Sequence, residues 1–194
     1  MSAVLETMTA QEYLVRERQA TFKSEFYRGE LFAMAGGSPT HSLIAANFVR
    51  EAGNGLKGSR CNVYNSDLRV RVNPAALHTY PDASIICGDL QFDDNQQDTV
   101  INPVVLIEVL SDSTEKYDRG AKSILYRQIP SLKELILIAQ NEAYVGHFVR
   151  QDSGGWLLRD VLDLSGSIEL AAVQISIALS EIYRSVTFSE QRSQ

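Results

Sequence analysis

A chain of 194 residues, with 44% hydrophobic and 22% charged residues, is typical of one soluble globular domain. Its net charge of −6 argues against an avid, sequence-independent nucleic-acid binder, although the metal-binding acids of a nuclease would add to the same negative total. Because residues 1–8 lack the features of a signal peptide and no apolar run reaches the roughly 18 residues of a membrane span, we expect a cytoplasmic protein that does not enter a membrane.

The N-terminal part of the chain predicts a helix, a hairpin and a second helix. Thr9 and Glu12 have the spacing of a capping box, which predicts a helix over 10–18. Strands over 23–27 and 30–34 are predicted around the turn Arg28-Gly29. Apolar positions at helical spacing then predict a helix over 40–56.

The middle of the chain predicts strands over 67–72 and 82–87, with a loop over 73–79 between them. Cys87 ends the second strand, and we expect it to be a small core residue, because its spacing from Cys61 does not match a zinc site. The segment 88–99, called the acidic loop below, contains four aspartates and is expected to be solvated and mobile.

The C-terminal half predicts a strand over 103–110 that is buried on both faces, a helix over 115–128 and a second buried strand over 134–139. This order is typical of a right-handed crossover with parallel strands. A hairpin of 143–150 and 156–160 and a short helix over 178–183 follow.

These elements predict one α/β (α+β) domain over residues 9–183, in which helices flank a mixed central sheet and hairpins stand at the N-terminal and C-terminal ends. We expect a poorly ordered N-terminus over residues 1–8 and a polar tail over 184–194.

Glu108 carries the functional prediction, because its neighbours from Pro103 to Leu110 are all apolar. An ionised, unpaired carboxylate in a buried strand is costly, and a neighbouring cation removes that cost. Asp82, 26 residues earlier, stands at the start of another strand. Two acids on strands indicate a divalent metal site.

The helix after Glu108 offers a lysine to this site. Asp118, Lys122 and Tyr126 share one helix face, and Lys122 follows Glu108 by 14 residues, far enough for the helix to turn back over the strand. In phosphodiester hydrolysis, Asp82, Glu108 and the Val109 carbonyl would hold Mg²⁺ (or Mn²⁺), and Lys122 would orient water or stabilise the developing charge.

Several motifs together resemble a known family. The strings are Tyr80-Pro-Asp82, Ile107-Glu-Val-Leu-Ser-Asp-Ser-Thr114, Tyr117-Asp-Arg-Gly-Ala-Lys122, Glu25-Phe-Tyr-Arg-Gly-Glu30, Ser38-Pro-Thr-His41 and Ser66-Asp-Leu-Arg-Val70. Their combination, over residues 9–183, resembles a large bacterial family of predicted restriction endonucleases, formerly a domain of unknown function, in the PD-(D/E)XK nuclease-fold superfamily.

The resemblance implies that Asp82 is the aspartate of the PD element and that Glu108 is the following acid. The usual pattern places a lysine two residues after this acid, where the chain has Leu110. Lys122 from the following helix fits that role instead. Four further residues are supporting candidates for the site: Glu30, His41, Asp67 and Asp118. Each also has an ordinary alternative role. Glu30 could be an exposed strand residue, His41 a histidine near a helix cap, Asp67 an acid at a strand start and Asp118 a partner of Lys122.

The function that the resemblance implies is a metal-dependent endonuclease acting on phosphodiester bonds in DNA. We expect a homodimer, since cutting both strands needs two sites, with the hairpin region 134–149 as its interface. Two alternatives stay open: a catalytically silent interaction or scaffold protein with the nuclease fold, and a small-molecule phosphohydrolase.

Overall fold

The computed structural model describes residues 8–34, 36–73 and 77–188. The expectations for residues 1–8 and 184–194 therefore fall mostly outside the described residues. Of those that are described, Met8 donates a backbone hydrogen bond to Gly29, and Phe188 packs its ring against Tyr183. In the part of the chain that is described, no helix has the length and apolar character needed to cross a membrane.

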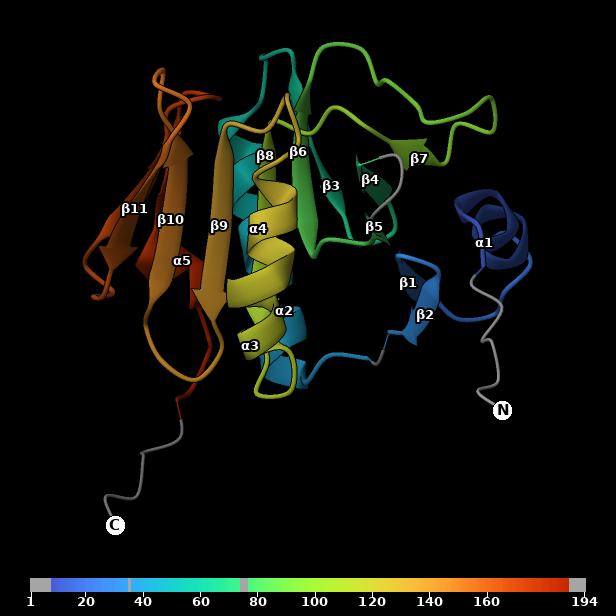
Figure 1. Cartoon of the computed structure of the whole chain (residues 1–194). Coiled ribbons are helices and arrows are strands. Elements are labelled where there is room, and N and C mark those ends of the chain that lie inside the picture. Colours follow the sequence, from blue (N-terminus) through green and yellow to red (C-terminus); the bar gives the residue numbers. More distant parts are fainter. Residues whose placement is uncertain (1–7, 35, 74–76, 189–194) are drawn as a thin grey trace.

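The larger of two main sheets has six strands and contains the predicted crossover (Figure 1). Its strands are β3 (Cys61–Asn65), β6 (Ala83–Cys87), β8 (Val105–Leu110), β9 (Glu134–Ala139), β10 (Val145–Arg150) and β11 (Trp156–Val161), in the order β11-β10-β9-β8-β6-β3. β8 and β9 are parallel and the other pairs are antiparallel, so the sheet is mixed, as predicted.

The N-terminal hairpin belongs to a second sheet rather than to the edge of the first. This sheet contains β1 (Ser24–Tyr27), β2 (Glu30–Ala33), β4 (Arg69–Asn73), β5 (Leu77–Thr79) and β7 (Thr99–Val100), in the order β2-β1-β5-β4-β7. The helix α1 (Ala10–Glu17), which has the predicted capping box, packs Tyr13 and Leu14 against Phe26. The prediction of a loop over 73–79 is wrong for the last residues of this range, because they form β5, which pairs with both β1 and β4.

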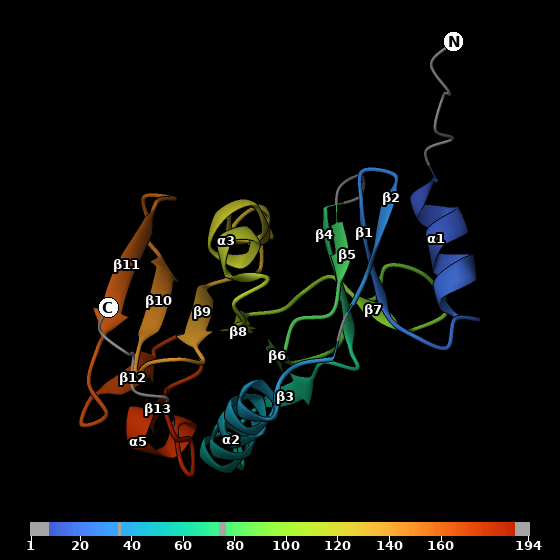
Figure 2. The same cartoon turned by 90° about the horizontal axis from the view of Figure 1, so that it is seen from below.

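Helices cover both faces of the six-stranded sheet (Figure 2). On one face lie α2 (Pro39–Gly55), α5 (Leu179–Ile182) and the small sheet of β12 (Ser167–Leu170) and β13 (Ile175–Ala178). Successive side chains of β8 point to opposite faces of the sheet. Ile107 and Val109 lie in the core on this face, and Leu106 and Leu110 lie in the core on the other face. Glu108 therefore faces the helix that follows β8.

That helix covers the other face and consists of α3 (Glu115–Tyr117), the π-helical turn η1 (Asp118–Lys122) and α4 (Ser123–Tyr126). The π turn is wider than an α turn, and Asp118 and Lys122 are both on the buried side, 4% and 5% exposed. Such turns are frequent at functional sites.

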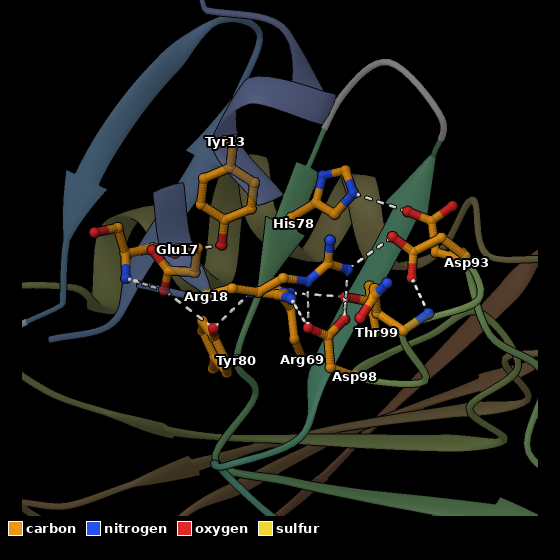
Figure 3. A network of polar contacts seen from close by, with 12 residues as sticks. Tyr13, Glu17, Arg18, Arg69, His78, Tyr80, Asp93, Asp98 and Thr99 are labelled. Carbon is orange, nitrogen blue, oxygen red and sulfur yellow. Dashed lines mark hydrogen bonds and ion pairs between the residues drawn. The ribbon is translucent and has the colours of Figure 1, made fainter. Parts of the chain in front are cut away.

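The acidic loop, expected to be solvated and mobile, is exposed at Asp89, Gln91 and 95–97, but other aspartates in it form ion pairs with the rest of the protein. Asp98 accepts hydrogen bonds from Arg18 at 2.7 and 3.0 Å and forms an ion pair with Arg69 at 2.9 Å (Figure 3). Asp93 forms a further ion pair with Arg71. Hydrogen bonds from Arg18, with the nearby charge of Arg69, hold the pKa of Asp98 well below its usual range despite partial burial. These ion pairs attach the loop to α1 and β4.

Arg69 is the member of this network whose loss should cost most, because it is 3% exposed. We expect Arg69→Met to lower the free energy of unfolding by about 3–5 kcal/mol, since it leaves buried polar partners without their cation. Urea unfolding at pH 7 measures the change. Arg159→Met, at an exposed position of β11, is the control and should change it by less than about 0.5 kcal/mol. Equal effects of the two substitutions would show that the network does not stabilise the fold.

The two cysteines form a disulfide, whereas the sequence predicted Cys87 as a small core residue. Cys61 lies directly opposite Cys87 in the pairing of β3 with β6. The strand β3 was not predicted from the sequence, so the disulfide could not be predicted either.

Within the region 134–149, expected to form the dimer interface, the strand β9 offers no free surface. All six residues of β9 are buried between β8 and β10, and β10 is in turn paired with β11. The edge strand is β11, where Leu157 and Leu158 are 41% and 44% exposed. The homodimer itself stays a prediction.

Candidate active site

A cleft of about 660 Å³ lies where the chain passes from the five-stranded sheet to the six-stranded sheet. Its lining comes from the β1–β2 hairpin, the start of α2, the ends of β5 and β8 and the helix after β8. The ionisable residues and aromatic residues in this lining are Glu25, Asp82, Glu108, Asp112, Asp118, His41, Lys122, Tyr27, Phe32, Tyr80 and Tyr117.

Strand pairing brings Asp82 and Glu108 together. In the antiparallel pairing of β6 with β8, Ala83 is opposite Ile107, so Asp82 continues the register to the position opposite Glu108. The Val109 N–H donates a hydrogen bond of 2.7 Å to Asp82 Oδ2, which fixes this carboxylate at the end of β8.

Glu108 is 5% exposed and is held by two side chains from the covering helix. Lys122 Nζ lies 3.0 Å from its Oε1 atom, and the Tyr126 hydroxyl donates a hydrogen bond of 2.5 Å to the same atom. Burial raises the pKa of Glu108 to about 8, and the nearby charges of Asp82 and Asp118 add to the rise, although Lys122 opposes it. The nearby charge of Lys122 does not offset the cost of burying the Glu108 carboxylate.

Lys122 is shared by three acids. Its Nζ atom lies 2.8 Å from Glu25 Oε1 and 3.5 Å from Asp118 Oδ1, in addition to its contact with Glu108. Although burial lowers the pKa of Lys122, the attraction of Glu108, Tyr126, Glu25 and Asp118 outweighs burial and raises it well above the usual value. Lys122 is therefore charged at neutral pH.

His41 stands in the first turn of α2 and faces Asp82. Its Nε2 atom lies 3.2 Å from Asp82 Oδ2, and a hydrogen bond to this carboxylate raises the pKa of His41 against the effect of burial. The carbonyl of Val109 contributes to the same shift. Gly37 leaves room for the imidazole, since a Cβ atom there would lie 2.6 Å from the ring.

Six of the residues predicted for the site line this cleft, but Glu30 and Asp67 do not. Glu30 is exposed at the turn end of the hairpin, opposite Tyr27. Asp67 has a side chain that is 75% exposed and pairs with Lys23 at 2.6 Å. Neither residue is near the acids that surround Lys122.

Glu25 is the cleft residue that the sequence analysis missed. It stands on β1, where Phe26 faces α1, so Glu25 and Tyr27 face the cleft. Thr79 donates a short hydrogen bond to Glu25 Oε1 from the end of β5. The apolar position of Phe26 in the alternating hairpin was the signal that could have identified Glu25. The hydroxyl of Tyr126, which was not among the predicted site residues, also donates a hydrogen bond to Glu108.

The cleft suits a hard divalent cation by its chemistry, although no preformed group of three or more His, Cys, Asp or Glu side chains arranged for a metal occurs within residues 8–34, 36–73 and 77–188. Tyr126 and Lys122 both contact Oε1 of Glu108, which leaves Oε2 for a ligand. Burial is the main cause of the raised pKa of Glu108, and a cation beside the carboxylate would favour its ionised form. Carboxylate and carbonyl oxygens are the ligands that Mg²⁺ and Mn²⁺ prefer.

A family model described as "Uma2: Putative restriction endonuclease" matches residues 10–180 of the chain. Two uncharacterized proteins of Synechocystis sp. are similar along nearly their whole length. One is 33% identical over 187 residues, which cover 96% of this chain and 97% of the relative. The other is 35% identical over 173 residues, which cover 89% of this chain and 98% of the relative.

The fold matches a solved structure. The crystal structure of a "putative nuclease belonging to DUF820" from Anabaena variabilis aligns with a TM-score of 0.73, at 15% identity, over 91% of this chain and 97% of that chain. The match confirms the predicted fold class, in which helices flank mixed sheets in a restriction-endonuclease-like arrangement.

Proposed function

Because the chain belongs to the family described as "Uma2: Putative restriction endonuclease", we propose that it is a metal-dependent endonuclease that hydrolyses phosphodiester bonds in DNA. The observation that carries the proposal is the convergence of Glu25, Glu108 and Asp118 on a single Lys122, in a cleft that Asp82 also lines. A buried set of acids with too few cations is costly for a fold to keep unless a ligand uses it.

In this proposal Asp82, Glu108 and the Val109 carbonyl hold Mg²⁺ or Mn²⁺. A divalent ion there would supply the charge that polarises a phosphoryl oxygen and makes water more acidic. The Val109 N–H keeps Asp82 in place by its hydrogen bond of 2.7 Å. The Tyr126 hydroxyl holds Glu108 by Oε1 and so presents Oε2 to the ligand.

Lys122 is the group of this chain that acts on the substrate. Its ammonium lies within 3.0 Å of both Glu25 and Glu108, and from there it can orient a water molecule and stabilise negative charge that develops on the phosphate. Asp118 holds the lysine from the same helix, and His41 holds Asp82 from the opposite side of the cleft.

The direct test is DNA cleavage by the purified protein loaded with Mg²⁺ or Mn²⁺. We expect supercoiled plasmid DNA to be nicked or linearised with metal and to stay intact with a chelator. We also expect bis-p-nitrophenyl phosphate to be a poor substrate, since the proposal requires a nucleic-acid strand. Hydrolysis of the small phosphoester without DNA cleavage would favour a phosphohydrolase, and hydrolysis of neither would favour a catalytically silent protein.

The hairpin offers a matched pair of variants for the same assay. We expect Glu25→Gln to slow plasmid cleavage by about 10²-fold, because it weakens the charge and position of Lys122. Glu30→Gln, five residues later on the exposed end of the hairpin, should leave the rate unchanged. The reverse result would mean that the early acid of the site is Glu30, as the sequence predicted.

A further inference from the structure

Phe32 is an exposed aromatic residue inside the candidate active site. Its side chain lines the cleft and is 46% exposed. The other face of the hairpin carries the packed residues, since Phe26 and Leu31 contact the core beneath α1. Phe32 therefore does not fill the core, and its ring is available to a ligand in the cleft.

The hairpin register places this ring beside the reacting groups. Phe32 is directly opposite Glu25 in the pairing of β1 with β2, so the two side chains share one face of the sheet. Opposed side chains of antiparallel strands have Cβ atoms about 4.5–5.5 Å apart. Because Glu25 contacts Lys122 at 2.8 Å, the phenyl ring is one strand away from the point where a phosphate would be cut.

The charge of the cleft limits which other side chains of the protein can contact a nucleic acid there. Five acids line it, against the two basic residues His41 and Lys122, and both of these already contact acids. The cleft thus offers few contacts to a run of phosphates. A stacking contact with a base is an alternative source of affinity.

A phenyl ring can stack only on a base whose face is free. In a duplex, both faces of each base are covered by its neighbours, so a base must leave the stack, or the strand must be unpaired, before it can meet Phe32. We propose that the cleft takes an unpaired stretch of a DNA strand, with one base stacked on Phe32 and the adjacent phosphate at Lys122. This inference rests on the proposed nuclease function and names its substrate class.

The test measures binding separately from cleavage. The probe is a short single-stranded DNA oligonucleotide with one 2-aminopurine, whose fluorescence falls when it stacks, and the comparison is the same sequence in a duplex. With the Glu108→Gln protein as the background, we expect quenching and tighter binding for the single strand. Phe32→Ala and Phe32→Leu should each weaken its binding roughly 10- to 100-fold, whereas Phe32→Tyr should retain it.

Phe22 provides the matched control, because it is 59% exposed and lies outside the cleft, beside α1. Phe22→Ala should bind the oligonucleotide like the parent protein. Tighter binding of the duplex, unchanged binding by Phe32→Ala, or full binding by Phe32→Leu would each overturn the inference. So would the absence of any binding.

Cleavage by proteins that keep Glu108 distinguishes the two proposals. If the oligonucleotide binds and responds to Phe32 but is never cut with Mg²⁺ or Mn²⁺, the nuclease proposal fails and the binding site stands. If DNA is cut but the duplex is preferred and Phe32→Ala has no effect, the nuclease proposal stands and the inference about unpaired DNA fails.

Discussion

The Glu108→Gln variant should lose DNA cleavage by about 10²–10³-fold or more while remaining folded. The substitution removes the carboxylate that contacts Lys122 at 3.0 Å and, in the proposal, one metal ligand. It keeps a hydrogen-bond acceptor for the Tyr126 hydroxyl at nearly the same place, so the packing of the covering helix should survive. Plasmid cleavage with Mg²⁺ and thermal unfolding of the same preparation measure the two effects.

The control for this variant is Glu142→Gln, which removes the same charge in an exposed turn. It should cleave DNA like the parent protein. If cleavage survives in Glu108→Gln at the parent rate, either a contaminating nuclease produced it or the site is wrongly assigned. If both variants lose activity and unfold early, the loss is structural and the assignment of Glu108 as a catalytic residue fails.

The second large effect is a loss of stability with rising pH in the absence of metal. The pKa of Glu108 rises from 4.5 to about 8 on folding, chiefly through burial. The folded state therefore binds this proton more tightly than the unfolded state, and the resulting stability is complete below pH 4.5 and is lost as the pH rises to about 8. Over that range the loss is about 5 kcal/mol, at about 1.4 kcal/mol for each pH unit.

Urea unfolding in the presence of a chelator between pH 5 and pH 8.5 tests this dependence. The difference between the parent protein and Glu108→Gln isolates the contribution of Glu108, since the raised pKa of His41 also makes stability depend on pH. We expect the difference to change steadily up to about pH 8 and Mg²⁺ to reduce it, because a cation favours the ionised carboxylate. Parallel pH profiles for the two proteins would contradict a strongly raised pKa.

Elements with local signals were predictable from the amino-acid sequence alone. The capping box of Thr9 and Glu12, the turn at Arg28-Gly29 and the apolar run around Glu108 each depend on neighbouring residues, and each forms as predicted. The strand–helix–strand crossover followed from hydrophobic periodicity and chain order, because few topologies are open to such a unit. The family was also recognisable from motifs spread along the chain.

Part of the candidate site was predictable for the same reason. Glu108 is conspicuous in any buried strand, and the spacing of Lys122 allowed its helix to return over that strand, where it contacts Glu108. From the sequence, Asp82 could be placed at the start of a strand but not beside Glu108. Its position next to Glu108 depends on the antiparallel register of β6 and β8.

Contacts between segments far apart in the sequence follow from the packing of the folded chain. Asp98 pairs with Arg18 from 80 residues away, which converts an apparently free acidic loop into a fixed one. Glu25 rather than Glu30 reaches Lys122, because the second sheet presents the open end of the hairpin to the cleft. Such partners depend on how whole sheets pack together, and the residues near each acid in the sequence carry no information about that packing.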